Sequence, residues 1–231
     1  MKTRQRMLIL GGNSSLASDL ISKASLIQTD VDVTVSDLDQ GPRNSLGHSK
    51  TFQLDLREAK SCENFSRSLV PGTYDYIVSL IGATSGIPIE SSTYSDIEKV
   101  FQINVIGVLS ILPSLQRALN ATGRMCFVSS SAAKGNSFDV AYAASKAALS
   151  VAAQSYSLRV PVAQAIFTLE PTAIEKSKMF GEMSPETQNK HRSRAQGELL
   201  QISQVNSKII ELLTDSKQVS GNFFLSNELP I

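Results

Sequence analysis

The sequence predicts an α/β protein whose single domain is a doubly wound, parallel seven-stranded sheet with helices on both faces. Short apolar and β-branched runs alternate with longer segments of helical spacing, and strands separated by helices imply right-handed crossovers in a parallel sheet. Several of the strand runs are apolar almost throughout, as burial on both faces requires. The 231 residues are enough for one large α/β domain and short for two.

Seven segments have the length and composition of strands. MLIL at 7–10, VDVTVS at 31–36 and TFQL at 51–54 come first, followed by YIVSL at 76–80 and RMCFVS at 124–129. AQAIFTL at 163–169 and NFFL at 222–225 complete the set. With no internal repeat or composition break to mark a linker, residues 1–231 are expected to form one domain.

Helical spacing occupies the windows 15–27, 58–69, 93–119, 140–159 and 200–214. The most apolar of these stretches, VIGVLSIL at 105–112, is shorter than the ~20 residues of a membrane span and is interpreted as a buried helix segment. The segment 175–203 is polar and carries the basic cluster KHRSR at 190–194. It is either a substrate lid inserted late in the fold or a solvated helical excursion, and the charge run alone favours the excursion.

Composition and charge argue against several classes of protein. Apolar residues make up 42% and charged residues 19%, an ordinary globular balance, and a net charge of +1 gives no basic field for nucleic acid or an anionic membrane. The basic start MKTRQRMLIL has only four apolar residues before Gly11, too few for a signal peptide. Cys62 and Cys126 are far apart and indicate reduced thiols rather than a disulfide or metal framework. We therefore expect a cytoplasmic protein without metal, nucleic acid or membrane.

LILGGNSSLASDL at 8–20 has the pattern of a strand, a turn and a helix. Ligands of parallel α/β sheets bind beyond the carboxyl ends of the strands. Gly11 can form the tight turn, Gly12 adds flexibility, and the free N–H groups of the following helix can bind a pyrophosphate. A strand-to-helix turn without a ligand has the same composition, so this signal alone is evenly balanced. The loop continues with Asn13, Ser14, Ser15 and Leu16.

Carboxylates follow the next two strands. Asp37 comes just after the second strand, 26 residues beyond Gly11. In a Rossmann-like unit such a carboxylate accepts hydrogen bonds from the adenosine ribose and repels a 2′-phosphate, which favours NAD over NADP. Asp37 can equally cap a turn or helix, and Asp39 competes with it. Asp55, at the end of the third strand, either borders an adenine pocket or caps the helix near 58.

AYAASKAALS at 141–150 places Tyr142 and Lys146 four residues apart, on one face of the predicted helix. A phenol with a pKa near ~10 is a poor acid at pH 7, and a nearby ammonium favours the phenolate. Tyr142 can then exchange a proton with a carbinol oxygen, while Lys146 also holds sugar hydroxyls. A core tyrosine with a lysine stem lying along apolar surface gives the same pattern.

RMCFVSSSAAK ends a strand in three serines, 11 to 13 residues before Tyr142. A hydroxyl at that strand end can hydrogen-bond a substrate carbonyl and share the charge that develops on it. Serines also commonly satisfy backbone groups at strand ends.

In this order, the motifs resemble the short-chain dehydrogenase/reductase family, in its single-domain form with a YxxxK active site, over essentially the whole chain. QINVIG at 102–107 resembles the family's helix-four motif and implies that Asn104 orients the lysine through a water. FVSSSAA resembles the strand-five motif and implies Ser130 as the catalytic hydroxyl, with Ser129 or Ser131 as alternatives. LEPTAIEKSKM at 169–179 resembles the nicotinamide-binding segment, and VSGNFFL at 219–225 the last strand.

This resemblance implies an NAD(H)-dependent oxidoreductase that interconverts a secondary alcohol and a ketone, with Tyr142 as general acid and base. Lys146 would lower the pKa of Tyr142 and hold the nicotinamide ribose, and family members are commonly homodimers or homotetramers through the helices at 93–119 and 140–159. The residues implied to bind the cofactor are Gly11, Asn13, Ser14, Ser15, Leu16, Asp37, Asp55, Leu56, Ile81, Gly82, Tyr142, Lys146, Pro171 and Ile174.

Three motifs depart from the family pattern. Where the family carries TGxxxGxG, Ser15 and Ala17 replace the second and third glycines; NNAG becomes SLIG at 79–82, and PG becomes Pro171–Thr172. These changes affect the grip on the cofactor rather than the acid–base groups, and the Ser15 hydroxyl can compensate as a phosphate donor. They also leave open a catalytically silent nucleotide-binding or regulatory module.

The sequence does not identify the substrate. The resemblance implies that the 175–203 segment and the loop at 83–92 determine it. KHRSR at 190–194 leaves an anionic small molecule among the candidates.

Overall fold

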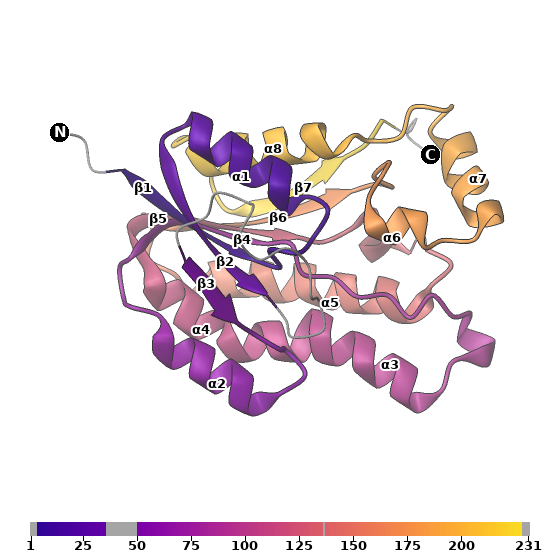
Figure 1. The fold of residues 1–231 in the computed structure, drawn as a ribbon, viewed down its shortest axis with the longest axis horizontal. Helices are drawn as coiled ribbons and strands as arrows, with labels where there is room; N and C mark the ends of the chain where they lie inside the picture. Colours follow the sequence, from indigo (N-terminus) through magenta and orange to yellow (C-terminus); the bar gives the residue numbers. More distant parts are fainter. Residues whose placement is uncertain (1–3, 36–49, 136, 228–231) are drawn as a thin grey trace.

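The computed structural model describes residues 4–35, 50–135 and 137–227. Its strands form one parallel sheet in the order β3-β2-β1-β4-β5-β6-β7, which confirms the predicted fold class (Figure 1). The chain runs outward from β1 in one direction and then outward from β4 in the other, so the crevice between these two strands is where a doubly wound sheet binds its ligand. The strands are β1 Gln5–Leu10, β2 Thr29–Val35, β3 Lys50–Gln53, β4 Tyr74–Ser79, β5 Leu119–Val128, β6 Ala165–Pro171 and β7 Gly221–Leu225.

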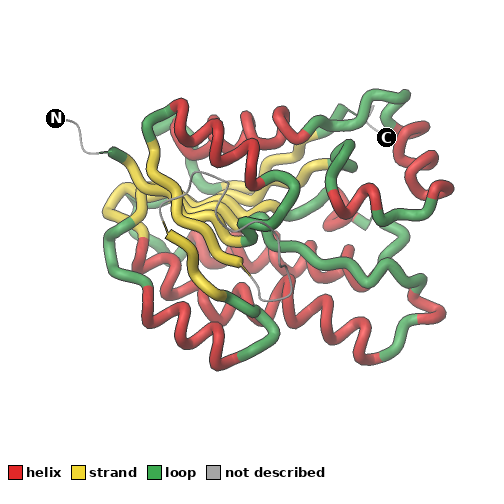
Figure 2. The backbone as a smooth tube through the Cα atoms, in the orientation of Figure 1, coloured by secondary structure: helices red, strands yellow, loops and turns green. Residues whose placement is uncertain are grey.

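Helices cover both faces of this sheet (Figures 1 and 2). The helices α1 (Ala17–Leu26) and α8 (Ile202–Thr214) pack on one face. On the other face lie α2 (Ala59–Ser68), α4 (Val108–Ala118) and α5 (Val140–Ser157). Side chains of β1 alternate between the two cores, with Leu8 and Leu10 on the α4 side and Met7 and Ile9 on the α1 side.

The predicted helix at 93–119 is divided into three parts. It begins as α3 (Tyr94–Phe101), continues through the π-helical turn η2 (Gln102–Gly107) and ends as α4. A β-carbon on Gly107 would lie 2.4 Å from the carbonyl oxygen of Leu56, so the glycine allows η2 to approach the segment after β3 closely. Periodicity does not reveal a π-helix, which is often found at functional sites.

The continuous helical run Tyr94–Ala118 is long and apolar enough to cross a membrane by length and composition. The sequence argument considered only residues 105–112, so its statement that no stretch is long enough to span a membrane was wrong. Buried core helices meet the same criterion, and Val100, Ile111 and Leu115 of this run are fully buried within the fold.

Other differences from the predicted elements are local. β5 begins at Leu119, which pairs with Tyr74 of β4; residues 120–123 form an irregularity in the strand before the pairing resumes at Arg124. β6 continues to Pro171, whose pairing with Leu225 extends the edge toward β7. Two short 3₁₀ helices, η1 (Ile89–Ser91) and η3 (Ser131–Lys134), were not predicted.

The 175–203 segment contains two helices, α6 (Lys178–Gly181) and α7 (Pro185–Arg194). It has a small core of its own, in which Phe180, Ala195 and Leu199 are buried. The basic side chains of α7 contact aromatic rings: Lys190 and Arg194 lie over Phe138, and Arg192 lies over Phe180. The helical excursion is therefore packed rather than merely solvated.

Candidate active site

The glycine turn after β1 approaches β2 closely. Gly11 has a positive φ of 86°, which favours glycine, and its N–H donates to the Thr34 hydroxyl at 3.0 Å. The N–H of Gly12 donates to the Thr34 carbonyl at 2.8 Å, and a β-carbon on Gly12 would lie 2.9 Å from Cβ of Val33. Gly12 therefore allows the turn to pack closely against β2, whereas the sequence argument expected it to add flexibility.

Both serines of the turn already accept hydrogen bonds from the protein. The Ser14 hydroxyl oxygen accepts from the Leu16 N–H at 3.1 Å. The Ser15 oxygen accepts from the N–H of Lys178, at the start of α6, at 2.8 Å. The hydroxyl protons of both serines remain donors. Asn13 lies in the same turn, and among the described residues no side chain caps α1 at Leu16.

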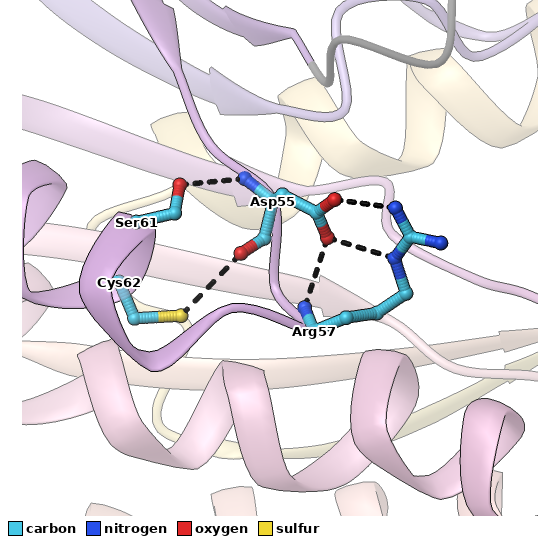
Figure 3. Close-up of polar contacts among 4 residues, drawn as sticks. All are labelled: Asp55, Arg57, Ser61 and Cys62. Carbon is cyan, nitrogen blue, oxygen red and sulfur yellow. Dashed lines mark hydrogen bonds and ion pairs between the residues drawn. The ribbon is translucent and has the colours of Figure 1, made fainter.

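Asp55, just after β3, is held by Arg57 (Figure 3). The Nε and backbone N–H of Arg57 both donate to Oδ1 of Asp55, at 2.9 and 3.0 Å, and Nη2 bonds the other oxygen. The Arg57 side chain holds the pKa of Asp55 below its ordinary value. The proposed capping role is wrong, because Glu58 is the N-cap of α2 and the Asp55 carboxylate bonds Arg57 instead. The neighbouring Leu56 side chain is buried in the core.

Asn104, in η2, joins three parts of the site. Its Oδ1 accepts from the Ala83 N–H and its Nδ2 donates to the Ala83 carbonyl, both at 2.8 Å. The same Nδ2 donates to the Ser145 hydroxyl at 2.8 Å, and that hydroxyl donates to the Tyr142 carbonyl. The Asn104 amide therefore fixes the loop after β4 against α5. The water-mediated contact with Lys146 implied by the resemblance remains a prediction.

Lys146 extends from α5 to the carboxyl ends of β4 and β5. Its ammonium donates to the carbonyls of Ile81 at 3.0 Å and Val128 at 3.1 Å. Only 2% of the residue is exposed, and burial lowers its pKa to about 8. A β-carbon on Gly82 would lie 3.1 Å from this ammonium, so Gly82 provides the space for it.

Tyr142 lies one turn before Lys146 on α5 and is also buried. Burial raises its pKa to about 12, and a hydrogen bond from the Ser130 side chain offsets part of that rise. The Lys146 ammonium is 5.8 Å from the centre of the tyrosine ring. The expected lowering of the Tyr142 pKa is therefore wrong for this structure, because desolvation of the phenolate, together with the negative charge of Asp139, outweighs the hydrogen bond from Ser130.

The three serines after β5 have different surroundings. Ser130 contacts the Tyr142 hydroxyl, and its oxygen also accepts from the Ala132 N–H. Ser129 is buried beneath the site, where it donates to the Lys146 carbonyl and accepts from Ser150. Ser131 begins η3. This geometry favours Ser130 as the hydroxyl that faces a substrate.

We predict that Ser130→Ala lowers kcat/KM by about 10²-fold, the size of effect seen when one donor to a developing oxyanion is lost. Its neighbour supplies the matched control: Ser129→Ala removes a buried hydroxyl that does not contact Tyr142 and is expected to reduce thermal stability more than kcat/KM. Steady-state kinetics and thermal unfolding of both variants test the assignment. A larger kinetic loss in Ser129→Ala would reverse it.

The remaining predicted residues lie near the same edge of the sheet or outside the described ranges. Pro171 ends β6 and is buried. Ile174 pairs with Leu200 at the base of the 175–203 segment. Asp37, and its competitor Asp39, are outside the described residues. Within the described ranges, no group of three or more His, Cys, Asp or Glu side chains is arranged to hold a metal.

Sequence reasoning missed Arg57 and Asp139. The proximity of Arg57 to Asp55 was visible in the sequence, where the two residues are separated by one position. Asp139 is the N-cap of α5 and accepts the Tyr142 N–H at 2.8 Å. The signal for it was an aspartate immediately before the helical spacing that contains Tyr142.

Comparison with solved structures shows the same fold at low sequence identity. A short chain dehydrogenase family protein from Francisella tularensis subsp. tularensis SCHU S4 is 17% identical, with a TM-score of 0.81 over 97% of this chain and 98% of that chain. An actinorhodin polyketide ketoreductase variant, solved with NADPH, is 18% identical, with a TM-score of 0.84 over 98% of both chains. A short chain dehydrogenase from Burkholderia cenocepacia J2315 in complex with NADP is also 18% identical, with a TM-score of 0.83 over 97% of both chains.

In sequence, the chain matches none of the curated proteins with which it was compared. It does match the family model of the short chain dehydrogenases over residues 6–188, which is most of its length. The matched region includes the glycine turn, Asn104, Ser130, Tyr142 and Lys146. The protein therefore belongs to the short-chain dehydrogenase/reductase family, a family of oxidoreductases that bind a nicotinamide cofactor.

Proposed function

We propose that the protein is an NAD(H)-dependent oxidoreductase that interconverts a secondary alcohol and a ketone, with Tyr142 as general acid and base. One observation carries the proposal: the hydroxyls of Tyr142 and Ser130 are hydrogen-bonded to each other, with the Lys146 ammonium 5.8 Å from the tyrosine ring. These groups lie on α5 and at the end of β5, beside the crevice where a parallel sheet binds its ligand.

The residues at this edge fit a dinucleotide. Gly12 lets the turn pack closely against β2, and the start of α1 that follows offers N–H groups and a positive dipole end to a pyrophosphate. Two carbonyls take two of the three Lys146 ammonium protons, which leaves the third for a ribose hydroxyl. Bound nicotinamide supplies or accepts the hydride.

In the direction of reduction, the substrate carbonyl oxygen accepts hydrogen bonds from Ser130 and Tyr142. As hydride reaches the carbonyl carbon, the Tyr142 proton passes to that oxygen and the tyrosine becomes a phenolate. With a pKa raised to about 12, Tyr142 holds this proton at neutral pH and is ready to act as an acid. We infer that neutral pH favours carbonyl reduction and that alcohol oxidation accelerates as the pH rises.

The preference for NAD rests on Asp37. This carboxylate follows β2 by two residues in sequence, where it would accept the ribose hydroxyls and repel a 2′-phosphate. Arg57, just after β3, is a cation that the sequence argument did not consider, and its guanidinium is bonded to the Asp55 carboxylate. Two of the similar structures were solved with NADP or NADPH, so NADP is the alternative that the binding test must include.

We propose a small uncharged alcohol or ketone as the substrate. An anionic substrate is the alternative implied by KHRSR, but those cations already contact the protein. Lys190 pairs with Glu186 at 2.7 Å, and Arg192 lies over the ring of Phe180. Contact with an anion would have to replace these interactions.

A homodimer or homotetramer in the cytoplasm is proposed from the family resemblance. The structure offers an apolar surface for it, since Ile106, Leu109 and Val151 are 51%, 37% and 62% exposed on the helices expected to associate. Exposed apolar side chains are typical of association surfaces when they lie in one patch.

A silent nucleotide-binding module is the second candidate. It is favoured by the state of the glycine turn, where the oxygens of Ser14 and Ser15 already accept backbone N–H groups. It is disfavoured by the set formed by Asn104, Ser130, Tyr142 and Lys146, since binding alone does not require an acid–base pair.

Titration of the purified protein with NADH and NADPH, followed by fluorescence, separates these candidates when it is combined with a panel of ketones and secondary alcohols. We expect tighter binding of NADH and turnover of at least one ketone. Binding without turnover of any compound would favour the module. Tighter binding of NADPH would overturn the preference assigned to Asp37.

A further inference from the structure

One carboxylate, that of Asp139, joins the catalytic helix to the loop that follows β4. Its Oδ1 accepts the N–H of Tyr142 at 2.8 Å and so caps α5. Its Oδ2 accepts four hydrogen bonds from the loop at 84–86: from the Thr84 hydroxyl at 2.5 Å, the Ser85 N–H and hydroxyl at 3.0 Å each, and the Gly86 N–H at 3.2 Å.

Only an ionised carboxylate suits both sets of donors. Five N–H and O–H groups point at Asp139, and asparagine or serine has a single side-chain oxygen to offer. Burial acts to raise the pKa of Asp139, but hydrogen bonds from Thr84, Tyr142, Ser85 and Gly86 outweigh it, so the pKa lies below its ordinary value. The anion also suits the positive end of the α5 dipole.

The contact with Asp139 sets the position of an otherwise exposed loop. Asn104 holds the loop at Ala83, immediately before the contact, and Gly86 turns the chain away with a φ of 65°. Residues 84–87 form no helix or strand and are only partly buried. Surface loops of this kind are mobile unless side chains fix them.

We propose that Asp139 is a positioning residue for substrate recognition, which fixes residues 84–86 as one wall of the substrate site at a set distance from Tyr142. The Asp139 carboxylate makes one bond to the Tyr142 backbone and four to residues 84–86. A displacement of these residues is therefore transmitted through Asp139 to the start of α5. The inference rests on the proposed function, because it takes the reacting carbonyl to lie against the Tyr142 hydroxyl.

The test compares Asp139→Ser with Asp139→Ala and the wild type. Serine retains one oxygen for the Tyr142 N–H, so α5 remains capped, but the four bonds to the loop are lost. We expect the KM for the ketone to rise at least tenfold in Asp139→Ser, while kcat and the affinity for NADH change less than threefold. Asp139→Ala is expected to show the same rise in KM together with a lower melting temperature.

Asp96→Ser is the matched control. Asp96 also accepts a backbone N–H and a hydroxyl, both from Thr93 at the start of α3, and within the described part of the chain its side chain hydrogen-bonds Thr93 rather than a residue assigned to the site. We expect its KM to equal that of the wild type.

Two further measurements distinguish positioning from a merely structural effect. The negative charge of Asp139 raises the pKa of Tyr142, so in Asp139→Ser the rise of alcohol oxidation with pH should begin at lower pH. The amides of Ser85 and Gly86 should exchange hydrogen at least tenfold faster in Asp139→Ser and at the wild-type rate in Asp96→Ser.

Unchanged exchange at both amides, or an unchanged KM for the ketone, would overturn the inference while the proposed function stands. A wild-type protein that binds NADH and turns over no compound would overturn the proposed function and with it the role in substrate recognition. Hydrogen exchange would then still decide whether Asp139 holds the loop.

Discussion

Tyr142→Phe is expected to lower kcat by about 10²- to 10⁴-fold, the range attributed to a general acid or base, while NADH binding survives. Phenylalanine retains the buried ring and removes only the hydroxyl that we propose gives its proton to the substrate oxygen. Ser130 retains its bond to the Ala132 N–H, so the loop after β5 is expected to keep its shape. Single-turnover kinetics with saturating ketone, and a fluorescence titration with NADH, measure the two effects separately.

Tyr156 supplies the control for this experiment. It lies on the same helix, after Lys146 in sequence, and packs against the core. Tyr156→Phe removes the same atom from α5 and is expected to leave kcat within a factor of about two, the usual size of a surface or peripheral change. If Tyr142→Phe retained wild-type turnover, Tyr142 would have no part in the proton transfer.

Lys146→Met is expected to have the second large effect, a fall of at least about 10²-fold in kcat/KM, since it removes the cation and its donor for the ribose. It should also change how stability depends on pH. Burial lowers the Lys146 pKa from 10.5 to about 8. Below pH 8 the lysine is protonated in both the folded and the unfolded state, so the whole cost of burying the charge is present.

Between pH 8 and 10.5 the folded protein loses this proton first and the unfolded chain keeps it. The free energy of unfolding of the wild type should therefore rise with pH relative to that of Lys146→Met, by about 3 kcal/mol across this window, and level off above it. Urea unfolding of both proteins at several pH values measures the difference. Methionine leaves the carbonyls of Ile81 and Val128 unpaired, which lowers the stability of the variant at every pH. Because this loss does not depend on pH, the slope of the difference still reports the titration of Lys146.

Lys134→Met is the matched control for this measurement, because the Lys134 side chain is half exposed. Its free energy of unfolding is expected to follow that of the wild type across the same pH range. Parallel curves for the wild type and Lys146→Met would show that burial does not lower the pKa of Lys146.

The fold, and the placement of Tyr142 and Lys146 on one helix face, were predictable from the sequence because they depend on local patterns. Parallel strands buried on both faces have continuous apolar runs, and two residues four apart on a helix share one face. The spacing of Tyr142 and Lys146 therefore placed both side chains on one face of the predicted helix before any tertiary contact was known. The π-helical turn η2 was not predictable in this way, because a helical hydrophobic pattern does not distinguish α from π turns.

Other parts of the site depend on contacts between distant segments. Three consecutive serines are equivalent in the sequence, and only the direction of the chain at the end of β5 turns Ser130 toward Tyr142 and Ser129 toward Ser150. The loop that bonds Asp139 lies more than 50 positions before it. The pair formed by Asp55 and Arg57 is local, by contrast, and was overlooked because Asp55 was considered only as a ligand or a cap.

The bond between the Ser15 hydroxyl and the Lys178 N–H has a consequence for protein engineering. A designer who compared this chain with the family pattern would replace Ser15 by glycine to improve the affinity for the dinucleotide. The same substitution would remove the acceptor that secures the first residue of α6. The glycine turn and the 175–203 segment therefore cannot be optimised independently, and a design that changes one of them needs a compensating change in the other.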